Sequence, residues 1–288
     1  KNFYVVDFEF IEENICLIGF EDRQLKKGRL ILLSPSEDTL AYLHVKRPKR
    51  LYRDGYQNIQ LITKDSIFQL FYKSPRFHQL FPTHVKEIPY EFFQLKFIEE
   101  DKFIYKSISG RDQGHEYFVI DTLKKERIPL KRIKNYEMEG AHSLSAGSES
   151  RGMRFQGRAD KQLTEEQMER LRDMYEAYVY DRLIIRFPVH SQLFKVGEGF
   201  VLVDITNRQI DHYSPDFELI KTVKAKFPKH KLRQKEVIQD SETMKLYWVY
   251  YKGSKALLGE IEINSGKIVR TLETPSVPFI ENIKIRNE

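Results

Sequence analysis

The feature that most constrains this chain is a pattern of short strands that recurs along its length. In residues 199–223, GFVLVDITNRQIDHYSPDFELIKTV, a continuous apolar run is followed by two runs in which apolar and polar residues alternate. Such runs predict three short β-strands, the first buried on both faces. Asp204 and Asn207 favour a tight turn after the first run. Pro215, followed by Asp216, favours a type I turn after the second. The stretch therefore predicts an antiparallel meander.

The same order of strand, tight turn and strand occurs elsewhere, at residues 28–45, 116–133 and 256–274, each preceded by further β-type runs. A fifth module, at 51–85, has the same rhythm. Modules of about 40 residues with about four strands each match the period of propeller blades. A large β-sandwich also has many short strands, but it would not repeat a four-strand unit in order. We predict blades near residues 5–45, 49–87, 91–133, 183–226 and 232–274.

Three blade motifs carry a resemblance to a known class of protein: NIQLITKDSIFQLF, GFVLVDITNRQIDHYSPDFELIKTV and LLGEIEINSGKIVRTLE. With them the chain resembles six-bladed β-propeller proteins of the kind abundant in Bacteroidetes, similar in appearance to NHL and YWTD-like propellers. The resemblance implies an all-β fold of four-stranded antiparallel blades in a single domain over residues 1–288. It also implies an extracytoplasmic protein that is located in the periplasm or at the cell surface. A lipid-anchored form before processing is part of this expectation. Such motifs specify the fold more strongly than an activity.

The number of blades departs from this resemblance. After the fifth module only residues 278–288 remain, which is enough for one strand, and residues 1–5 could add one more. Propellers avoid exposed sheet edges by closing their ring, and one terminus commonly completes the last blade. We expect six blades with an incomplete sixth. A five-bladed ring, or residues missing from this sequence, are the alternatives.

One segment, residues 134–182, interrupts the blades. Its first part is polar and rich in Gly and Ser, and residues 164–183 have the apolar spacing of a helix that begins with a capping box. Long loops in compact folds are often functional, and arginine suits bidentate recognition of carboxylate or sulfate groups. The hypothesis is that this loop contacts an anionic or polar partner; a solvated loop with incidental charge is the alternative. The candidate ligand-binding residues are His142, Arg151, Arg154, Arg158 and Lys161.

Motifs for catalysis, metal or cofactor binding are missing from the sequence, which has no HExxH, no GxSxG and no phosphate-cradling glycine loop. No cofactor or metal is expected, and catalytic residues are not assigned. The histidines that could converge only through the fold are His115, His142, His190 and His212. Aspartates recur near strand ends, where turn caps are expected rather than metal ligands. These are Asp7, Asp54, Asp121 and Asp204.

Composition adds further limits. The net charge of +6 is modest and spread along the chain, so no nucleic-acid partner is expected. The densest basic run, VKRPKRLYR at 45–53, is interpreted as a solvated connection between blades, with a phosphate-binding patch as the alternative. Cys16, the single cysteine, and Trp248 lie in apolar strand patterns and are predicted to be buried. No apolar stretch approaches the roughly 18 residues of a membrane helix, and no signal peptide follows Lys1, so a targeting segment is expected to have been removed or left out.

Two classes of function fit these patterns. The first is a non-enzymatic binding or scaffold propeller of the cell envelope, a monomer whose loops hold a protein, peptide or glycan. The second is a hydrolase or lyase that acts on a polysaccharide or a small ester at the central channel. Because the candidate strands carry mostly apolar and mixed-charge residues rather than a catalytic set, the sequence favours binding.

Overall fold

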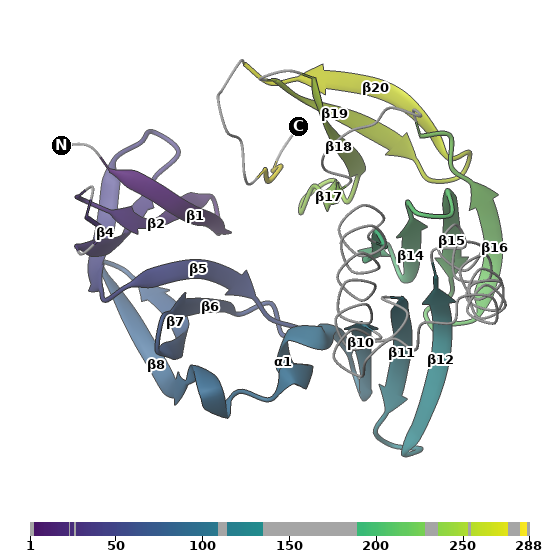
Figure 1. The fold of residues 1–288 in the computed structure, drawn as a ribbon, viewed down its shortest axis with the longest axis horizontal. Helices are drawn as coiled ribbons and strands as arrows, with labels where there is room; N and C mark the ends of the chain where they lie inside the picture. Colours follow the sequence, from purple (N-terminus) through teal and green to yellow (C-terminus); the bar gives the residue numbers. More distant parts are fainter. Residues whose placement is uncertain are drawn as a thin grey trace, which may run out of the picture. The chain divides into compact units, whose positions relative to one another are not determined.

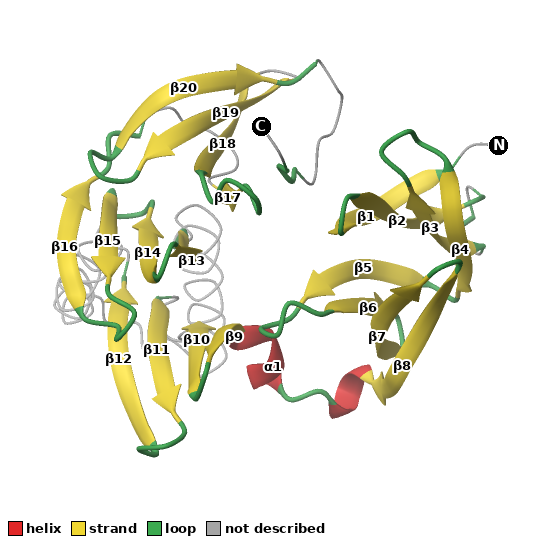
Figure 2. Cartoon of the chain, turned by 180° about the vertical axis from the view of Figure 1, so that it is seen from behind, coloured by secondary structure: helices red, strands yellow, loops and turns green. Residues whose placement is uncertain are grey.

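The computed structural model describes residues 3–22, 24–25, 27–108, 114–134, 189–227, 236–252, 255–275 and 283–286. Within these ranges the chain forms five antiparallel sheets, each of four strands that are consecutive in sequence (Figure 1). This is the predicted meander, and it confirms an all-β propeller of four-stranded blades. The two short helices of the described residues, η1 (Val85–Glu87) and α1 (Tyr90–Gln94), lie between the second and third sheets (Figure 2).

The strands follow the predicted blades closely. The first two blades are β1 (Tyr4–Ile11), β2 (Asn14–Phe20), β3 (Gly28–Leu33) and β4 (Thr39–Val45), then β5 (Pro48–Arg53), β6 (Ile59–Thr63), β7 (Ser66–Lys73) and β8 (Arg76–His84). The third is β9 (Leu95–Glu99), β10 (Lys102–Ile108), β11 (His115–Asp121) and β12 (Glu126–Ile133). The last two are β13 (Ser191–Val196), β14 (Gly199–Asp204), β15 (Gln209–Tyr213) and β16 (Leu219–Lys224), then β17 (Glu236–Gln239), β18 (Leu246–Lys252), β19 (Lys255–Glu262) and β20 (Lys267–Glu273).

The expected sixth blade is not shown, and the five-bladed alternative agrees with the described sheets. In the region 278–288, the described residues 283–286 form no strand. Ile283 and Ile285 instead pack against a small cluster of the fifth blade formed by Tyr247, Val249 and Leu258. The C-terminal segment therefore adds apolar contacts to an existing blade.

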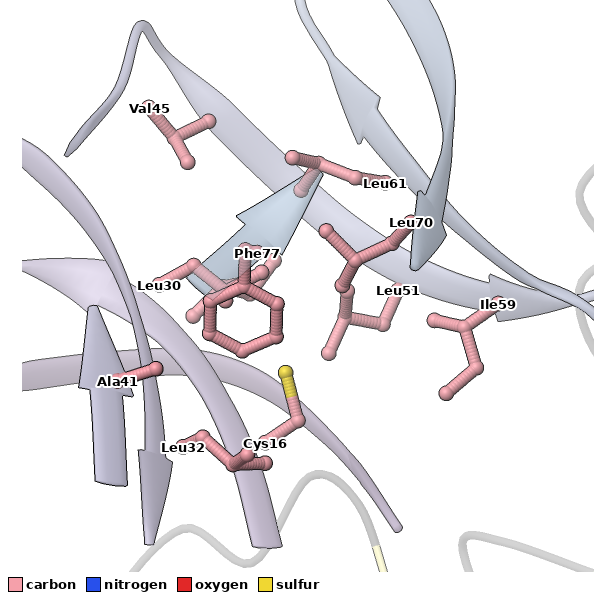
Figure 3. Packing of buried hydrophobic residues seen from close by; sticks show 11 residues of the cluster. Cys16, Leu30, Leu32, Ala41, Val45, Leu51, Ile59, Leu61, Leu70 and Phe77 are labelled. Carbon is pink, nitrogen blue, oxygen red and sulfur yellow. The ribbon is translucent and has the colours of Figure 1, made fainter. Parts of the chain in front are cut away.

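The chain divides into two compact units, and each has its own core. The first unit is Lys1–Lys106 with Tyr117–Pro129, and the second is Ser107–Glu116 with Leu130–Glu288. In the first unit, side chains of the first two blades form one cluster, and the sulfur of Cys16 points into it (Figure 3). Cys16 is completely buried, as predicted. The other labelled members of this cluster are Leu30, Leu32, Ala41, Val45, Leu51, Ile59, Leu61, Leu70 and Phe77.

The second strand of a blade is buried on both faces in three clear cases. Every residue of β6 is buried, as are five of the six residues of β14 and the first four of β18. This burial explains why their sequences are nearly continuous apolar runs rather than alternating ones. The fourth strands are the opposite case, because β16 and β20 are exposed at most positions.

The stretch 199–223 forms the predicted hairpins. Strand β14 pairs with β15, and β15 pairs with β16, both antiparallel. In the second turn the amide of Phe217 donates to the carbonyl of Ser214 at 2.9 Å, and Phe217 has a φ of 66°. Such a left-handed residue ends a tight turn before the next strand begins.

Aspartates cap the turn after a strand in four blades, which confirms the prediction for Asp54, Asp121 and Asp204. Asp204 accepts hydrogen bonds from the backbone and side-chain nitrogens of Asn207, at 2.9 and 2.8 Å. Asp121 accepts the amide of Lys124 at 2.9 Å. Asp240, which the sequence analysis did not single out, accepts the amide of Glu242 at 3.0 Å and the hydroxyl of Thr243 at 2.6 Å.

Asp7 has a different role from the predicted cap. It lies inside β1, where its carboxylate accepts the amide of Phe8 at 2.8 Å. Its other oxygen accepts the amide of Leu51 in β5 at 2.9 Å. Asp7 thus joins the first strands of two neighbouring blades. The start of the third blade also differs, because residues 90–94 are helical where the blade predicted near residues 91–133 would begin with a strand.

Replacement of Trp248 tests the core of the second unit. The side chain is 2% exposed, and its ring centroid lies 5.0 Å from that of Phe227 and 5.2 Å from that of Tyr250. Among the described residues, its buried indole nitrogen has no hydrogen-bond partner. Trp248→Ala should lower the free energy of unfolding by about 3 to 5 kcal/mol. Trp248→Phe should cost under about 1.5 kcal/mol, because the lost volume is offset by removal of an unsatisfied N–H. Urea unfolding checks both values, and equal losses would contradict the assignment.

Replacement of Asp54 tests the turn caps. Its buried carboxylate accepts the amides of Tyr56 and Asn58, both at 2.9 Å, and the side-chain nitrogen of Gln60 at 2.7 Å. Asp54→Ala leaves these donors without their acceptor and should cost about 2 to 4 kcal/mol of unfolding free energy. Asp54→Asn keeps one carbonyl oxygen for the two amides and should cost less. Urea unfolding measures both free-energy changes. If Asp54→Ala leaves the unfolding free energy unchanged, the cap is dispensable.

Candidate anion-binding site

Three cationic side chains of the first unit gather where the second and third blades begin. Arg50 extends from β5, Lys96 from β9 and Lys106 from β10. The Arg50 guanidinium lies over the ring of Phe93, 5.5 Å from its centroid, and the Lys96 ammonium donates to the Phe93 backbone carbonyl at 3.2 Å. Arg50 and Lys96 therefore both contact Phe93.

The local structure explains this placement. Along β5, Leu51 is buried in the core while Arg50 and Tyr52, on either side of it, share the opposite face. The guanidinium is 5.7 Å from the centroid of the Tyr52 ring. Strand β9 pairs with β10 in antiparallel register, with a shift between Ile104 and Tyr105, directly before Lys106.

Aromatic side chains form a wall beside these cations. The helix α1 supplies Phe92 and Phe93, whose ring centroids are 5.3 Å apart. Tyr52 contacts both rings, at 5.9 Å from Phe92 and 5.6 Å from Phe93. The Lys106 ammonium lies 5.8 Å from the centroid of the buried Tyr117 ring. Rings at these distances attract a cation through their electron-rich faces, so Tyr52 and Phe93 stabilise the position of Arg50, and Tyr117 that of Lys106.

The electrostatics of the cluster are those of like charges under partial burial. Burial lowers the pKa of Lys106 to about 8, and the positive charge of Lys96 contributes to the same shift. The pKa of Lys96 is also lowered, by burial first and then by Arg50. Both causes disfavour the charged form of an amine. A bound anion would offset the repulsion between the neighbouring cations. The three side chains therefore provide a place where negative charge is stabilised.

This cluster changes the interpretation of the basic run at 45–53. That run contains strand β5 rather than only a solvated connection, and Arg50 belongs to the cation cluster. The alternative stated for the run, a phosphate-binding patch, stays a prediction. Sequence reasoning missed Lys96 and Lys106, since each looks like one lysine among the 48 basic residues of the chain.

The site residues predicted in the long insertion are not tested. His142, Arg151, Arg154, Arg158 and Lys161 lie outside the described residues, as does the helix expected at 164–183. Their role in contacting a partner stays a prediction.

The remaining candidate histidines belong to the second unit and make separate contacts. The Nδ1 atom of His115 is 2.6 Å from the hydroxyl of Ser191, and both side chains are buried. The Nε2 atom of His212 lies 3.0 Å from the carbonyl of Ile263, and burial lowers the pKa of His212. The amide of His190 donates to the hydroxyl of Thr206 at 2.7 Å. His115 and Ser191 are a base and a hydroxyl in contact, yet their burial indicates that they tie β11 to β13.

A buried ion pair of the second unit also contrasts with the cation cluster. Lys131 is paired with the buried carboxylate of Asp211. That carboxylate also accepts the hydroxyl of Thr222 at 2.7 Å. Because this buried charge has an opposite charge and a further hydrogen bond, it has the character of a structural pair. Across the part of the chain that the structure describes, no group of three or more His, Cys, Asp or Glu side chains could hold a metal ion.

Comparisons with known proteins give similarities of fold only. The sequence matches no family model and no curated protein. Among solved structures, streptogramin B lyase is 9% identical, with a TM-score of 0.32, covering 94% of this chain and 68% of that one. The β-propeller domain of Myceliophteria thermophila Cps50 (Swd1) is 10% identical, with a TM-score of 0.36, covering 94% and 74%. BamB from Moraxella catarrhalis is 10% identical, with a TM-score of 0.28, covering 93% and 76%.

None of the helices in the described ranges has the length and apolar character needed to cross a bilayer.

Proposed function

We propose that this protein is a non-enzymatic binding propeller whose ligand presents a carboxylate, phosphate or sulfate group to Arg50, Lys96 and Lys106. The observation that carries the proposal is that Arg50 and Lys96 meet at Phe93, the guanidinium over its ring and the ammonium at its carbonyl. Lys106 lies on the paired strand β10. A protein, peptide or glycan that carries acidic groups fits this description.

The three cations have complementary roles in such a site. The planar guanidinium of Arg50 can form two parallel hydrogen bonds to one carboxylate, phosphate or sulfate group. The ammonium groups of Lys96 and Lys106 then act as point charges on the remaining oxygens. Because both lysines are half-buried, their attraction to an anion is screened less by salt than it would be at an open surface.

The aromatic wall gives the site a second means of selection. Phe92, Phe93 and Tyr52 offer apolar surface directly beside the charges. A ligand with an apolar or ring-shaped body next to its acidic group can bury that body against these rings, whereas a small inorganic anion cannot. We therefore expect acidic sugars or acidic side chains on an apolar scaffold to bind more tightly than phosphate alone.

Charge-neutral variants test the proposal. Arg50→Gln and Lys96→Gln should each weaken binding of an acidic ligand roughly 10- to 100-fold, which corresponds to the loss of one charge-assisted hydrogen bond. Isothermal titration with a panel of uronic-acid oligosaccharides, sulfated oligosaccharides and acidic peptides provides the measurement, with uncharged oligosaccharides for comparison.

Lys64→Gln is the matched control, because it removes the same charge from an exposed turn between β6 and β7. It should bind as the unchanged protein does. If all three variants lose the same affinity, the attraction comes from net charge rather than from this site. If no acidic ligand binds the unchanged protein, the proposal is wrong.

We also propose that the protein works outside the cytoplasm, in the periplasm or at the cell surface. The support is the resemblance to envelope propellers, and a site for acidic polymers is consistent with that setting. Fractionation of cells that express the complete gene product, followed by detection of the protein in each fraction, tests this. Recovery in the cytoplasmic fraction alone would overturn it.

A further inference from the structure

A groove of the first unit lies apart from the cation cluster, between the fourth strands of the first two blades. Residues 39–43 of β4 form one wall. The other wall consists of Pro75, Arg76 and Phe77, where the turn after β7 leads into β8. The volume of the groove is about 530 Å³, within the range of known ligand pockets. No lining residue belongs to the cation cluster, so the groove is a separate feature.

Strand β4 supplies a wall of this groove because it is the last strand of its sheet. It pairs with β3 on one side only, so its other side is available to line a groove. Thr39 pairs with Leu33 and Ala41 pairs with Leu32. Leu40 is therefore the extra residue of a bulge. A bulge at a sheet edge redirects a side chain, and Leu40 is exposed in the groove.

The base of the groove is apolar. Ala41 and Phe77 are buried and belong to the cluster that joins the first two blades, shown in Figure 3, and Leu43 packs against that cluster. Leu40 and Tyr42 line the same groove but are exposed. An apolar side chain that enters the groove would contact these apolar atoms and remove Leu40 and Tyr42 from water, which is favourable.

Arg76 is the one charged side chain among the lining residues, and it is exposed. Within the described ranges its side chain has no ion pair and no hydrogen-bond partner. Arg29 differs, because its guanidinium lies 5.1 Å from the centroid of the Tyr42 ring and is paired with Glu21 at 2.6 Å. A free guanidinium beside an apolar groove is complementary to a carboxylate, with which it can form two parallel hydrogen bonds.

We infer that this groove binds an extended segment of a partner protein, with a large apolar side chain in the groove and an Asp or Glu carboxylate on Arg76. Residues 39–43 span roughly 13 Å at about 3.3 Å per residue, which suits four or five residues of a second extended chain. Alternate side chains of such a chain point to the same side, so the apolar and acidic residues are expected two positions apart.

The lining of the groove favours a peptide over a glycan. Only Thr39, Tyr42 and Arg76 among the lining residues have polar side-chain groups, which is few for recognition of sugar hydroxyls. This binding goes beyond the proposed anion site and does not depend on it.

Peptide arrays probed with the whole chain test the inference. The probes are ten-residue peptides of Gly and Ser with three varied positions that hold every combination of apolar, polar and acidic residues. Fluorescence anisotropy in solution then measures the affinity of the peptides that bind. Peptides with Leu, Phe or Tyr two positions from Asp or Glu should bind best. Replacement of the acid by its amide should weaken binding roughly 10-fold, because a charge-assisted pair with Arg76 is lost.

Two variants and their matched controls locate the binding. Arg76→Gln and Leu40→Ser change exposed side chains of the groove and should each weaken binding of the best peptide roughly 5- to 50-fold. With Arg76→Gln, the acidic peptide and its amide should bind equally. Lys73→Gln removes the same charge from an exposed neighbour outside the lining residues, and Leu219→Ser removes an exposed leucine from β16. Both controls should bind as the unchanged protein does, and melting curves confirm that all four variants are folded.

The outcomes separate this groove from the other possible sites. If no peptide binds better than its amide, or if Lys73→Gln weakens binding as much as Arg76→Gln, the inference is wrong. If Arg50→Gln abolishes binding and Arg76→Gln does not, the peptides occupy the proposed anion site, which overturns this inference and supports the other proposal. If sedimentation shows dimers that Leu40→Ser disrupts and no peptide binds, the groove holds a second copy of the chain, which also overturns the inference.

Discussion

The burial of the second strand on both faces in three blades is the constraint on which much of the described structure depends. In β6 every residue is buried, as are five of the six residues of β14 and the first four of the seven residues of β18. A strand of this kind is stable only when side chains cover it from above and below, since isolated antiparallel hairpins bury too little apolar surface. Leu61 of β6 lies in a cluster with residues of the first blade, and Trp248 of β18 packs with residues of the fourth. The second and fifth blades are therefore completed by contacts with a neighbouring blade of the same unit.

Most of the buried polar groups described in this structure have hydrogen-bond or ion-pair partners. The buried aspartates are satisfied by turn amides, as Asp54 and Asp204 show. Asp211 is satisfied by Lys131 and Thr222. The cluster of Arg50, Lys96 and Lys106 differs, because burial first, and neighbouring cations second, lower the pKa values of its two lysines. Perturbation by like charges in a partly buried place is the electrostatic pattern of functional sites more often than of structural ion pairs.

Most of the fold could be predicted from the sequence, because its information is local. Alternation of apolar and polar residues predicts strands, and Asp, Asn and Pro predict the turns between them. The blades and the turn caps at Asp121 and Asp204 could therefore be predicted correctly. The burial of Trp248 followed from a strand with apolar residues on both faces. The helix α1 did not, because five residues are too few to show a helical period against the aromatic run FFQLKF.

The candidate site could not be predicted in the same way. Arg50, Lys96 and Lys106 come from three strands in two blades, and their meeting depends on strand register and on the rings of Phe93 and Tyr117. A sequence shows that these residues are basic but not that they share a place. The number of blades was difficult to predict for a similar reason. Residues 278–288 have the apolar pattern of a strand, but Ile283 and Ile285 pack against the fifth blade instead.

The exposed fourth strands have a consequence for how the protein behaves at high concentration. A sheet edge offers backbone groups to a strand of another molecule, and charged residues, proline and irregular pairing oppose such contact. Strand β16 carries Lys221 and Lys224, which discourage intermolecular pairing. Strand β8 relies on Pro82 and the positive φ of Phe81, where its register with β7 shifts. Strand β4 has weaker protection, because Leu40 and Tyr42 are exposed on it with only His44 as a titratable neighbour in the strand. Strand β4 therefore offers an apolar edge to a strand of another molecule when the protein is concentrated.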